Sequence, residues 1–540
     1  MDHINKLLMS FSQIPFFKEF RRLDIHRKIY IIGLLIMAIG LPLSPFLVSN
    51  AQFIIGLNWL FERKFKTKFT TLINNKVIWI LLLLPLLHIL WLINTSDFSY
   101  ALHDLKIKLP LLAIPLVLGT TKPLSQKELR WFLYAFVFAV FCGTTVSFAV
   151  ITGIYKIEYH DIRNISVFIS HIRFGLMIVL SLLIIGYYFI IDYKTLPTWK
   201  KTSLSLLTIW FLSFLVILQS ITGWIALLLL LILIFAKNYK KIKPRFLRVA
   251  ICIVLLSIII GSIGLVSKAY SDFYSVKTCN FANLPEQTPR GNKYLNDTTS
   301  QLKENGYYVR ILISYKELAQ TWPKLSKIPF QGYDANGYPI WNTMIRYLTS
   351  KGLPKDTDGL LALDPDDIEL IENGYANCVY RKKFIPYVKI YNVIWEIDRY
   401  RKTGNANDKS IVQRIEFSRA ALHIIHNNFW FGVGTGDLKN AYNNAYKEIK
   451  TNLKKRNRLR AHNQFLTFFV TFGIFGFLLA LFSMVYPGIK KRHNGGVFLT
   501  GFLLIIFISM LNEDTLETQA GVTFYIVFYT LFVFQNHNND

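Results

Sequence analysis

The chain has 540 residues, of which 52% are hydrophobic, 15% aromatic and only 17% charged. Soluble proteins carry about 25% charged residues, and the apolar residues here form blocks long enough to cross a bilayer. This composition excludes a string of soluble domains and predicts an all-α polytopic membrane protein. The net charge of +28 then reflects the Lys and Arg that membrane proteins collect on cytoplasmic loops, and we expect no nucleic-acid partner.

Twelve apolar segments follow one another along the chain, nine before a long polar stretch and three after it. They predict an N-terminal membrane region (1–268), an extracytoplasmic domain (269–461) and a C-terminal membrane region (462–540). Two segments are short for a full crossing, and the seventh and eighth are nearly continuous. The segments are 30–47, 49–62, 77–94, 108–120, 131–152, 171–192, 203–219, 222–236, 247–268, 463–487, 497–511 and 519–535.

Basic residues alternate between successive loops. The N-terminus and every second loop after it are rich in Lys and Arg, whereas the opposite loop 512–518 contains neither. The positive-inside rule therefore predicts an even number of crossings, with both termini in the cytoplasm. Nine crossings place the polar stretch 269–461 outside the cytoplasm.

The polar stretch spans roughly 190 residues, too many for a plain loop. Helical periodicity at 411–425 indicates a mostly helical domain, and the acidic run Asp364-Pro-Asp366-Asp367 predicts the cap of a helix that begins near Asp366. Cys279 and Cys378 are the only cysteines outside the apolar segments. On an oxidising side of the membrane they predict a disulfide.

Arg460, His462 and Asn463 stand where the polar domain re-enters the membrane, and Gly473 and Gly476 follow. A histidine at this depth can act as a general base, because its pKa lies near neutrality. The alternative is an interfacial histidine without a role. The two glycines predict a small face that another helix can approach closely.

Three stretches together resemble the O-antigen ligase and O-antigen polymerase superfamily of bacterial membrane glycosyltransferases. The number of crossings and the large outer loop between the ninth and tenth also resemble that family. Members often carry an Arg near the start of the eighth segment, where this chain has Ile221. The stretches are His462-Asn463 followed by Gly473, Gln413-Arg414 followed by Gly432-Val433-Gly434-Thr435-Gly436, and Asn512-Glu513-Asp514 through Glu517.

The resemblance implies an enzyme of the bacterial inner membrane that takes a glycan from undecaprenyl pyrophosphate. The acceptor hydroxyl would belong to lipid A–core in lipopolysaccharide biosynthesis. A polymerase or a protein O-oligosaccharyltransferase is the alternative within the superfamily, and a polyisoprenoid-glycan transporter is the rival from another class. Nothing in the residues calls for a metal or a cofactor, and the glycine-rich turn is not a nucleotide loop because no strand–helix unit surrounds it.

The resemblance maps a catalytic base onto His462 and a functional arginine onto Arg414. Arg414 suits a pyrophosphate, because a guanidinium binds phosphate oxygens in pairs; the alternative is a solvated helix face. Arg173 lies at the head of the sixth segment, where an arginine is costly unless it is paired, faces a cavity or snorkels to the lipid surface. We expect it to be a second phosphate contact that converges with Arg414 on His462.

The remaining predicted substrate-binding residues are Arg460, Asn463, Glu513 and Asp514. The two carboxylates could orient the histidine, pair with an arginine or hold the acceptor hydroxyl, and the sequence leaves these three roles open. The basic run 450–460 precedes the histidine. It would attract an anionic lipid substrate or simply form a solvated face.

Overall fold

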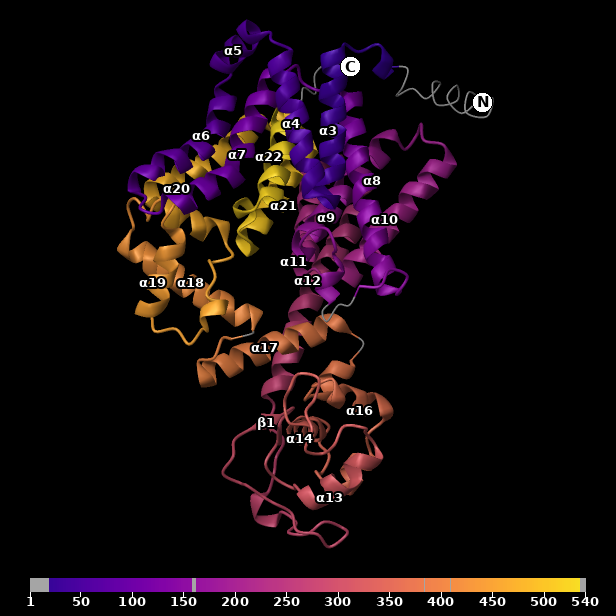
Figure 1. The fold of residues 1–540 in the computed structure, drawn as a ribbon. Coiled ribbons are helices and arrows are strands. Elements are labelled where there is room, and N and C mark those ends of the chain that lie inside the picture. The colour runs from indigo at the N-terminus through magenta and orange to yellow at the C-terminus, as the bar shows by residue number, and fades with distance from the viewer. Residues whose placement is uncertain (1–18, 158–161, 383, 408, 535–540) are drawn as a thin grey trace. The chain divides into compact units, whose positions relative to one another are not determined.

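The computed structural model describes residues 19–157, 162–382, 384–407 and 409–534, and Figure 1 shows its fold. Almost all of its regular structure is helical, which confirms the all-α prediction. The chain forms two compact units. Unit 1 comprises Met1–Lys241 and Arg414–Asp540, and unit 2 comprises Ile242–Gln413.

Unit 1 is a helical bundle. Its helices are α3 (Ile25–Leu43), α4 (Pro45–Phe61), α5 (Phe65–Asn74), α6 (Lys76–Leu90), α7 (Phe98–Thr120), α8 (Gln126–Ile151), α9 (His171–Asp192), α10 (Thr198–Leu218), α11 (Ile221–Asn238), α19 (Leu438–Glu448), α20 (Gln464–Lys490), α21 (Arg492–Asn512) and α22 (Gln519–Phe534). Its 3-10 turns are η1 (Trp91–Asn94), η2 (Ile162–Ile165), η3 (Tyr239–Lys241), η7 (Lys455–Asn457) and η8 (Thr515–Glu517). Helix α18 (Ser410–Asn427) runs across the boundary between the units.

Within the described residues, eight helices are long and apolar enough to cross a membrane. They are α3, α6 with η1, α8, α9, α10, α11 with η3, α12 (Arg245–Tyr274) and α20. Helix α4, the part of α21 from Gly496 and helix α22 are shorter apolar helices. Helix α7 covers the remaining predicted segment and carries charges in its first half. The protein is therefore a multi-pass membrane protein.

The two ends of unit 1 differ in their loops. Near the start of α3, Arg27 Nε donates to Glu128 Oε1 at 3.0 Å, and Gly119 at the end of α7 lies against Ile78 and Phe534. The start of α3 and the end of α22 therefore lie at one end of the bundle. We call it the basic end, because the lysine-rich loops after α4 and α7 are there.

The opposite end holds the loop between α21 and α22. Asn512 Nδ2 donates to Thr222 Oγ1 at 2.7 Å, which joins the end of α21 to the start of α11. At the other ends of the same two helices, Lys237 Nζ donates to Thr500 Oγ1 at 2.6 Å. We call the end around Asn512 the site end.

Unit 2 consists of short helices around a small core, together with α12. The core gathers Trp322, Tyr347 and Leu348, all fully buried. The other elements are α13 (Tyr315–Thr321), α14 (Ile340–Ser350), α15 (Thr357–Leu361), α16 (Pro365–Glu372), α17 (Ile385–Thr403), η4 (Phe281–Asn283), η5 (Trp322–Lys324), η6 (Cys378–Arg381) and the antiparallel strands β1 (Lys303–Glu304) and β2 (Tyr307–Tyr308). Asp364 and Asp367 form a capping box at the start of α16, which confirms the predicted helix cap.

The predicted disulfide is wrong, because Cys279 and Cys378 are both free thiols. The sulfur of Cys378 lies 3.4 Å from the carbonyl oxygen of Ser350 and 3.6 Å from Asn305 Nδ2. Cys279 instead lines a hollow beside Lys355. Two cysteines of one domain bond only when their Cα atoms come within about 7 Å in a suitable orientation, and each thiol here has its own surroundings.

Candidate active site

The start of α20 is fixed by Asn463. Its Oδ1 accepts hydrogen bonds from the backbone N–H groups of Phe465 and Leu466 at 3.0 and 3.1 Å. Its Nδ2 donates to the carbonyl of Leu511 at 3.1 Å. The preceding residue, His462, has a left-handed backbone with φ of 49°. Asn463 therefore caps α20 and links it to α21. These bonds also fix the position of the adjacent residue, His462.

Helix α20 breaks at Gly473, whose backbone angles are φ 64° and ψ −170°. The glycine-rich turn docks on this break: Gly434 N–H donates to the carbonyl of Thr471 at 3.0 Å, and Ile474 N–H donates to that of Phe429 at 2.8 Å. A Cβ on Gly473 would lie 2.3 Å from the backbone of Trp430. At Gly473 a tight turn rather than a helix makes the close approach, whereas Gly476 lies against the side chain of Trp91, which follows α6.

The two arginines that we predicted to bind phosphate, Arg414 and Arg173, both contact the chain where α21 ends. Arg414 on α18 donates a hydrogen bond to Asn512 Oδ1. Arg173 at the head of α9 places its Nε 3.5 Å from Glu513 Oε2. The side chains of Arg173 and Glu513 are each 14% exposed, so this ion pair is largely shielded from the surface. Two arginines that lie 241 positions apart in the chain thus contact adjacent residues, Asn512 at the end of α21 and Glu513 directly after it.

Glu517 is the centre of a buried ionic network at the site end. Its carboxylate accepts from Arg460 at 2.7 Å, from Lys108 Nζ at 3.1 Å and from Gln464 Nε2 at 3.2 Å. Lys108 also donates to Asp104 one helical turn earlier on α7, at 2.5 Å. No sequence motif singled out Lys108 and Asp104. Their signal was an i, i+4 charge pair at the edge of an apolar segment, a place where charges are costly and often functional.

Asp514 lies between this network and the histidine. Its Oδ1 accepts from Thr467 Oγ1 at 2.7 Å, and its Oδ2 lies 4.0 Å from Arg460 Nε. Burial raises the pKa of Asp514, although Arg460 and the bond from Thr467 counteract part of that rise. Burial also raises the pKa of Glu513, against the opposing effect of Arg173.

Glu517 shows the opposite balance. Burial alone would raise its pKa, but Lys108 and Arg460 outweigh burial and the pKa is lowered well below the usual range. Glu517 is therefore a carboxylate at any physiological pH, and it neutralises cations that the protein could not otherwise bury.

The imidazole of His462 packs near Phe417, with ring centroids 5.6 Å apart. Burial lowers the pKa of His462 below its ordinary value of 6.5. Asp514 raises that pKa, whereas Arg414 and Arg460 lower it further. The imidazole is therefore mostly neutral near pH 7, and a neutral imidazole has one ring nitrogen that can accept a proton.

Arg414 differs from the other buried cations of this end. Its hydrogen-bond partner is a neutral amide, and it forms no ion pair with a carboxylate in the part of the chain that the structure describes. Burial lowers the pKa of Arg414, yet an arginine stays protonated. Arg414 therefore keeps a positive charge that no carboxylate contacts directly within the described ranges.

The structure brings the predicted site residues together around the loop between α21 and α22. Each one contacts this loop or the end of α21 before it, or is coupled electrostatically to the loop. The set comprises Arg173, Arg414, Arg460, His462, Asn463, Glu513 and Asp514. Ile221, which stands where the resemblance leads us to expect an Arg, is 55% exposed, and its neighbour Thr222 holds Asn512 instead.

The basic run before the histidine is arranged differently. Lys454, Lys455 and Arg456 are exposed, so they remain on the surface while Arg460 enters the network. Among the described residues, no group of three His, Cys, Asp or Glu side chains is placed to hold a metal ion.

Residues 379–481 match a family model described as O-antigen ligase. This stretch includes Arg414, the glycine-rich turn, His462 and the break at Gly473. It therefore confirms the resemblance that the sequence motifs indicated. No curated protein matches the chain.

Proposed function

On the premise that residues 379–481 belong to the O-antigen ligase family, we propose that this protein moves a glycan from undecaprenyl pyrophosphate to a hydroxyl of lipid A–core. We place it in a bacterial inner membrane with both termini in the cytoplasm and the site end facing outward. Two features support this orientation: the lysine-rich loops gather at the basic end, and the start of α3 and the end of α22 lie there too.

In the proposed reaction His462 is the general base. Its neutral imidazole accepts the proton of the acceptor hydroxyl while the hydroxyl oxygen attacks the anomeric carbon of the donor. The bond from that carbon to the phosphate oxygen breaks, and its electron pair leaves with the pyrophosphate. Attack from the face opposite the leaving group inverts the anomeric carbon.

In this proposal Arg414 and Arg173 bind the leaving pyrophosphate and neutralise its negative charge. The observation that carries it is a half-buried, neutral imidazole that is electrostatically coupled to Arg414, a cation that contacts no carboxylate of the described residues. A donor phosphate could form an ion pair with Arg414 directly, whereas at Arg173 it would compete with Glu513. Glu517 and Lys108 would hold Arg460 and Asp514 beside the histidine without touching the substrate.

The test is transfer by the purified full-length protein in detergent, with a lipid-pyrophosphate glycan as donor and lipid A–core as acceptor. Product formed without a membrane gradient supports the proposal and contradicts a transporter. Glycan joined instead to a second lipid-linked glycan would make the protein a polymerase. No transfer to either acceptor, with donor bound, would overturn the proposed reaction.

A further inference from the structure

Helix α5 separates two hollows at the basic end of unit 1, far from the candidate active site. One hollow is apolar and the other polar, and their volumes are about 350 Å³ and 700 Å³. Neither belongs to the network around Glu517. The pair therefore calls for its own explanation.

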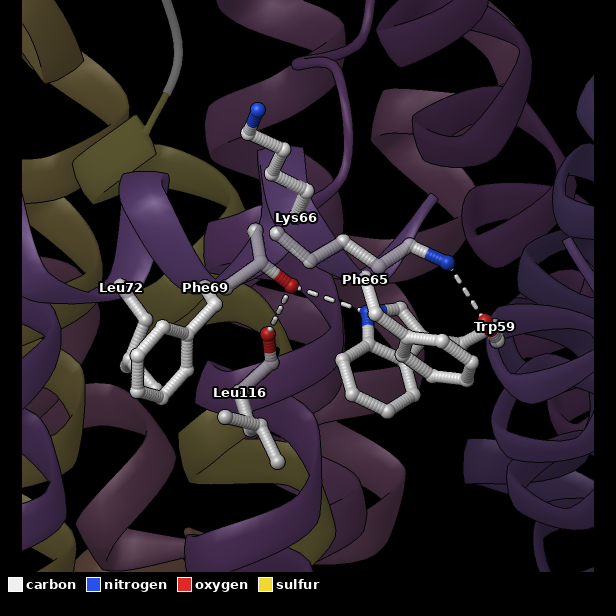
Figure 2. A pocket seen from close by; sticks show the side chains of 8 residues that line it. Trp59, Phe65, Lys66, Phe69, Leu72 and Leu116 are labelled. Atoms are coloured by element: carbon white, nitrogen blue, oxygen red, sulfur yellow. Dashed lines mark hydrogen bonds between the residues drawn. The ribbon is translucent and has the colours of Figure 1, made fainter. Parts of the chain in front are cut away.

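The apolar hollow lies between α5, the end of α4 and the end of α7 (Figure 2). Its walls are braced: Trp59 Nε1 donates to Thr120 Oγ1 at 2.9 Å, and Lys68 Nζ donates to the carbonyl of Trp59 at 2.5 Å. Phe65 and Phe69 remain 52% and 63% exposed. A fixed apolar wall beside exposed aromatic rings suits a hydrocarbon chain.

The polar hollow lies on the other face of α5. It is lined by two lysines, three threonines and two asparagines: Lys66, Thr67, Thr70, Thr71, Asn74, Asn75 and Lys491. The side-chain ammonium groups of Lys66 and Lys491 have no hydrogen-bond or ion-pair partner in the described part of the chain, and neither hollow has a carboxylate among its lining residues. Two unneutralised ammonium groups in a polar hollow suit a phosphate.

The period of α5 explains why both hollows share a residue. At 3.6 residues per turn, Phe65, Phe69 and Leu72 fall on one face and the threonines on the opposite face. Lys66 falls on the border and lines both hollows. In Figure 2 its amine points away from the aromatic rings. A ligand that uses both hollows must place its charge next to its apolar part.

We propose that the two hollows together bind one anionic glycerophospholipid from the leaflet at the basic end. An acyl chain lies along Trp59, Phe65 and Phe69, and the phosphate lies between Lys66 and Lys491. The short amphipathic helix α5, with lysines beside an exposed aromatic face, is the kind of element that lies in the membrane interface. A free phosphate would use only the polar hollow and leave the apolar one empty.

The experiment titrates the full-length protein in detergent with phosphatidylglycerol, with phosphatidylcholine of the same chains and with inorganic phosphate, and counts bound lipid by native mass spectrometry. We expect phosphatidylglycerol to bind about 25-fold tighter than phosphatidylcholine, because each of the two lysines contributes separately. A lysine near an anionic lipid surface contributes about a fivefold factor. Lys66→Ser and Lys491→Ser should therefore each weaken phosphatidylglycerol binding by about that factor.

Two controls keep the proposal open to refutation. Lys194→Ser removes an exposed charge outside both hollows and should leave binding unchanged. Leu72→Trp fills the apolar hollow and should weaken binding of both lipids alike. Equal affinity for the two lipids, or displacement of phosphatidylglycerol by inorganic phosphate alone, would overturn the proposal. So would a loss at Lys194→Ser equal to that at Lys66→Ser.

Discussion

The two ends of the membrane bundle use the same basic residue types in opposite ways. At the site end, Lys108 and Arg460 are packed against the carboxylate of Glu517. At the basic end, Lys66 and Lys491 line a polar hollow that contains no carboxylate. Burial accounts for the difference, since a buried charge is stable only beside a partner whereas an exposed charge remains hydrated.

This contrast leads to different expectations for mutations. Charges at the site end share partners, so a change at one of them alters the pKa and position of the others. Among the described residues, Lys66 and Lys491 at the basic end share no partner, so their effects should add. The predictions below test this difference, beginning with the largest expected effect.

Replacing His462 by Ala should lower the rate of glycan transfer by about 10²–10⁴-fold, the usual contribution of a general base. The protein should still insert in the membrane, because Asn463 rather than His462 caps α20. The measurement is transfer by purified protein with saturating donor. The matched control is His423→Ala, since His423 Nε2 is hydrogen-bonded to Glu448 Oε2 at 2.6 Å and its side chain is one-third exposed. Transfer within about threefold of wild type in His462→Ala would show that the imidazole is not the base.

Replacing Glu517 by Gln should destabilise the bundle by about 3–5 kcal/mol, because it leaves Lys108 and Arg460 buried without their shared carboxylate. The measurement is the thermal melting temperature in detergent. The control is Glu19→Gln, which breaks an exposed pair with Lys127 at the basic end. Such a pair contributes only about 0–1 kcal/mol.

A double variant sharpens this test. In Lys108→Met with Glu517→Met, Asp104 and Arg460 still lose their partners, so only a small part of the lost stability should return. Equal melting shifts for Glu517→Gln and Glu19→Gln would contradict the contrast between the two ends.

Replacing Arg414 by Ala should weaken donor binding by about 10–100-fold, the range expected for a hydrogen bond to a charged group. Arg173→Ala should cost less, because a donor that binds Arg173 must first displace Glu513. Binding of lipid-pyrophosphate glycan to the two variants measures the difference. Arg414→Lys should recover only part of the loss, since an ammonium cannot bind two phosphate oxygens in a planar fork. A larger loss at Arg173 than at Arg414 would contradict the assignment.

Much of the fold could be predicted from the sequence, because apolar blocks and helical periodicity are local signals. Each of the twelve predicted segments overlaps at least one described helix, and α18 lies where the periodicity at 411–425 placed it. The site was predictable only in part. His462, Arg414 and Arg173 stood out through motif order and position, but the contact of Lys108 with Glu517 joins residues 409 positions apart. Only packing between α7 and the last loop brings them together.

Two further failures have the same origin. The partner of Gly473 is a turn rather than a helix, which depends on how residues 429–434 fold back on α20. The free thiols of Cys279 and Cys378 depend on the packing of unit 2. A local pattern shows that a residue is special, but it does not identify the distant group that contacts it.

The pH profile should give the smallest effect and the most specific one. The proposed base works only when its imidazole is neutral, so transfer falls as pH drops through the pKa of His462. That pKa is lowered, so the acid limb should lie below pH 6.5. Arg414 lowers this pKa and Asp514 raises it. Arg414→Gln should therefore move the limb to higher pH, and Asp514→Asn should move it to lower pH, in kcat/KM profiles normalised to each variant's maximum. Movement in the same direction for both variants, or none, would mean that the limb belongs to another group, of which Glu513 is the nearest candidate because burial raises its pKa.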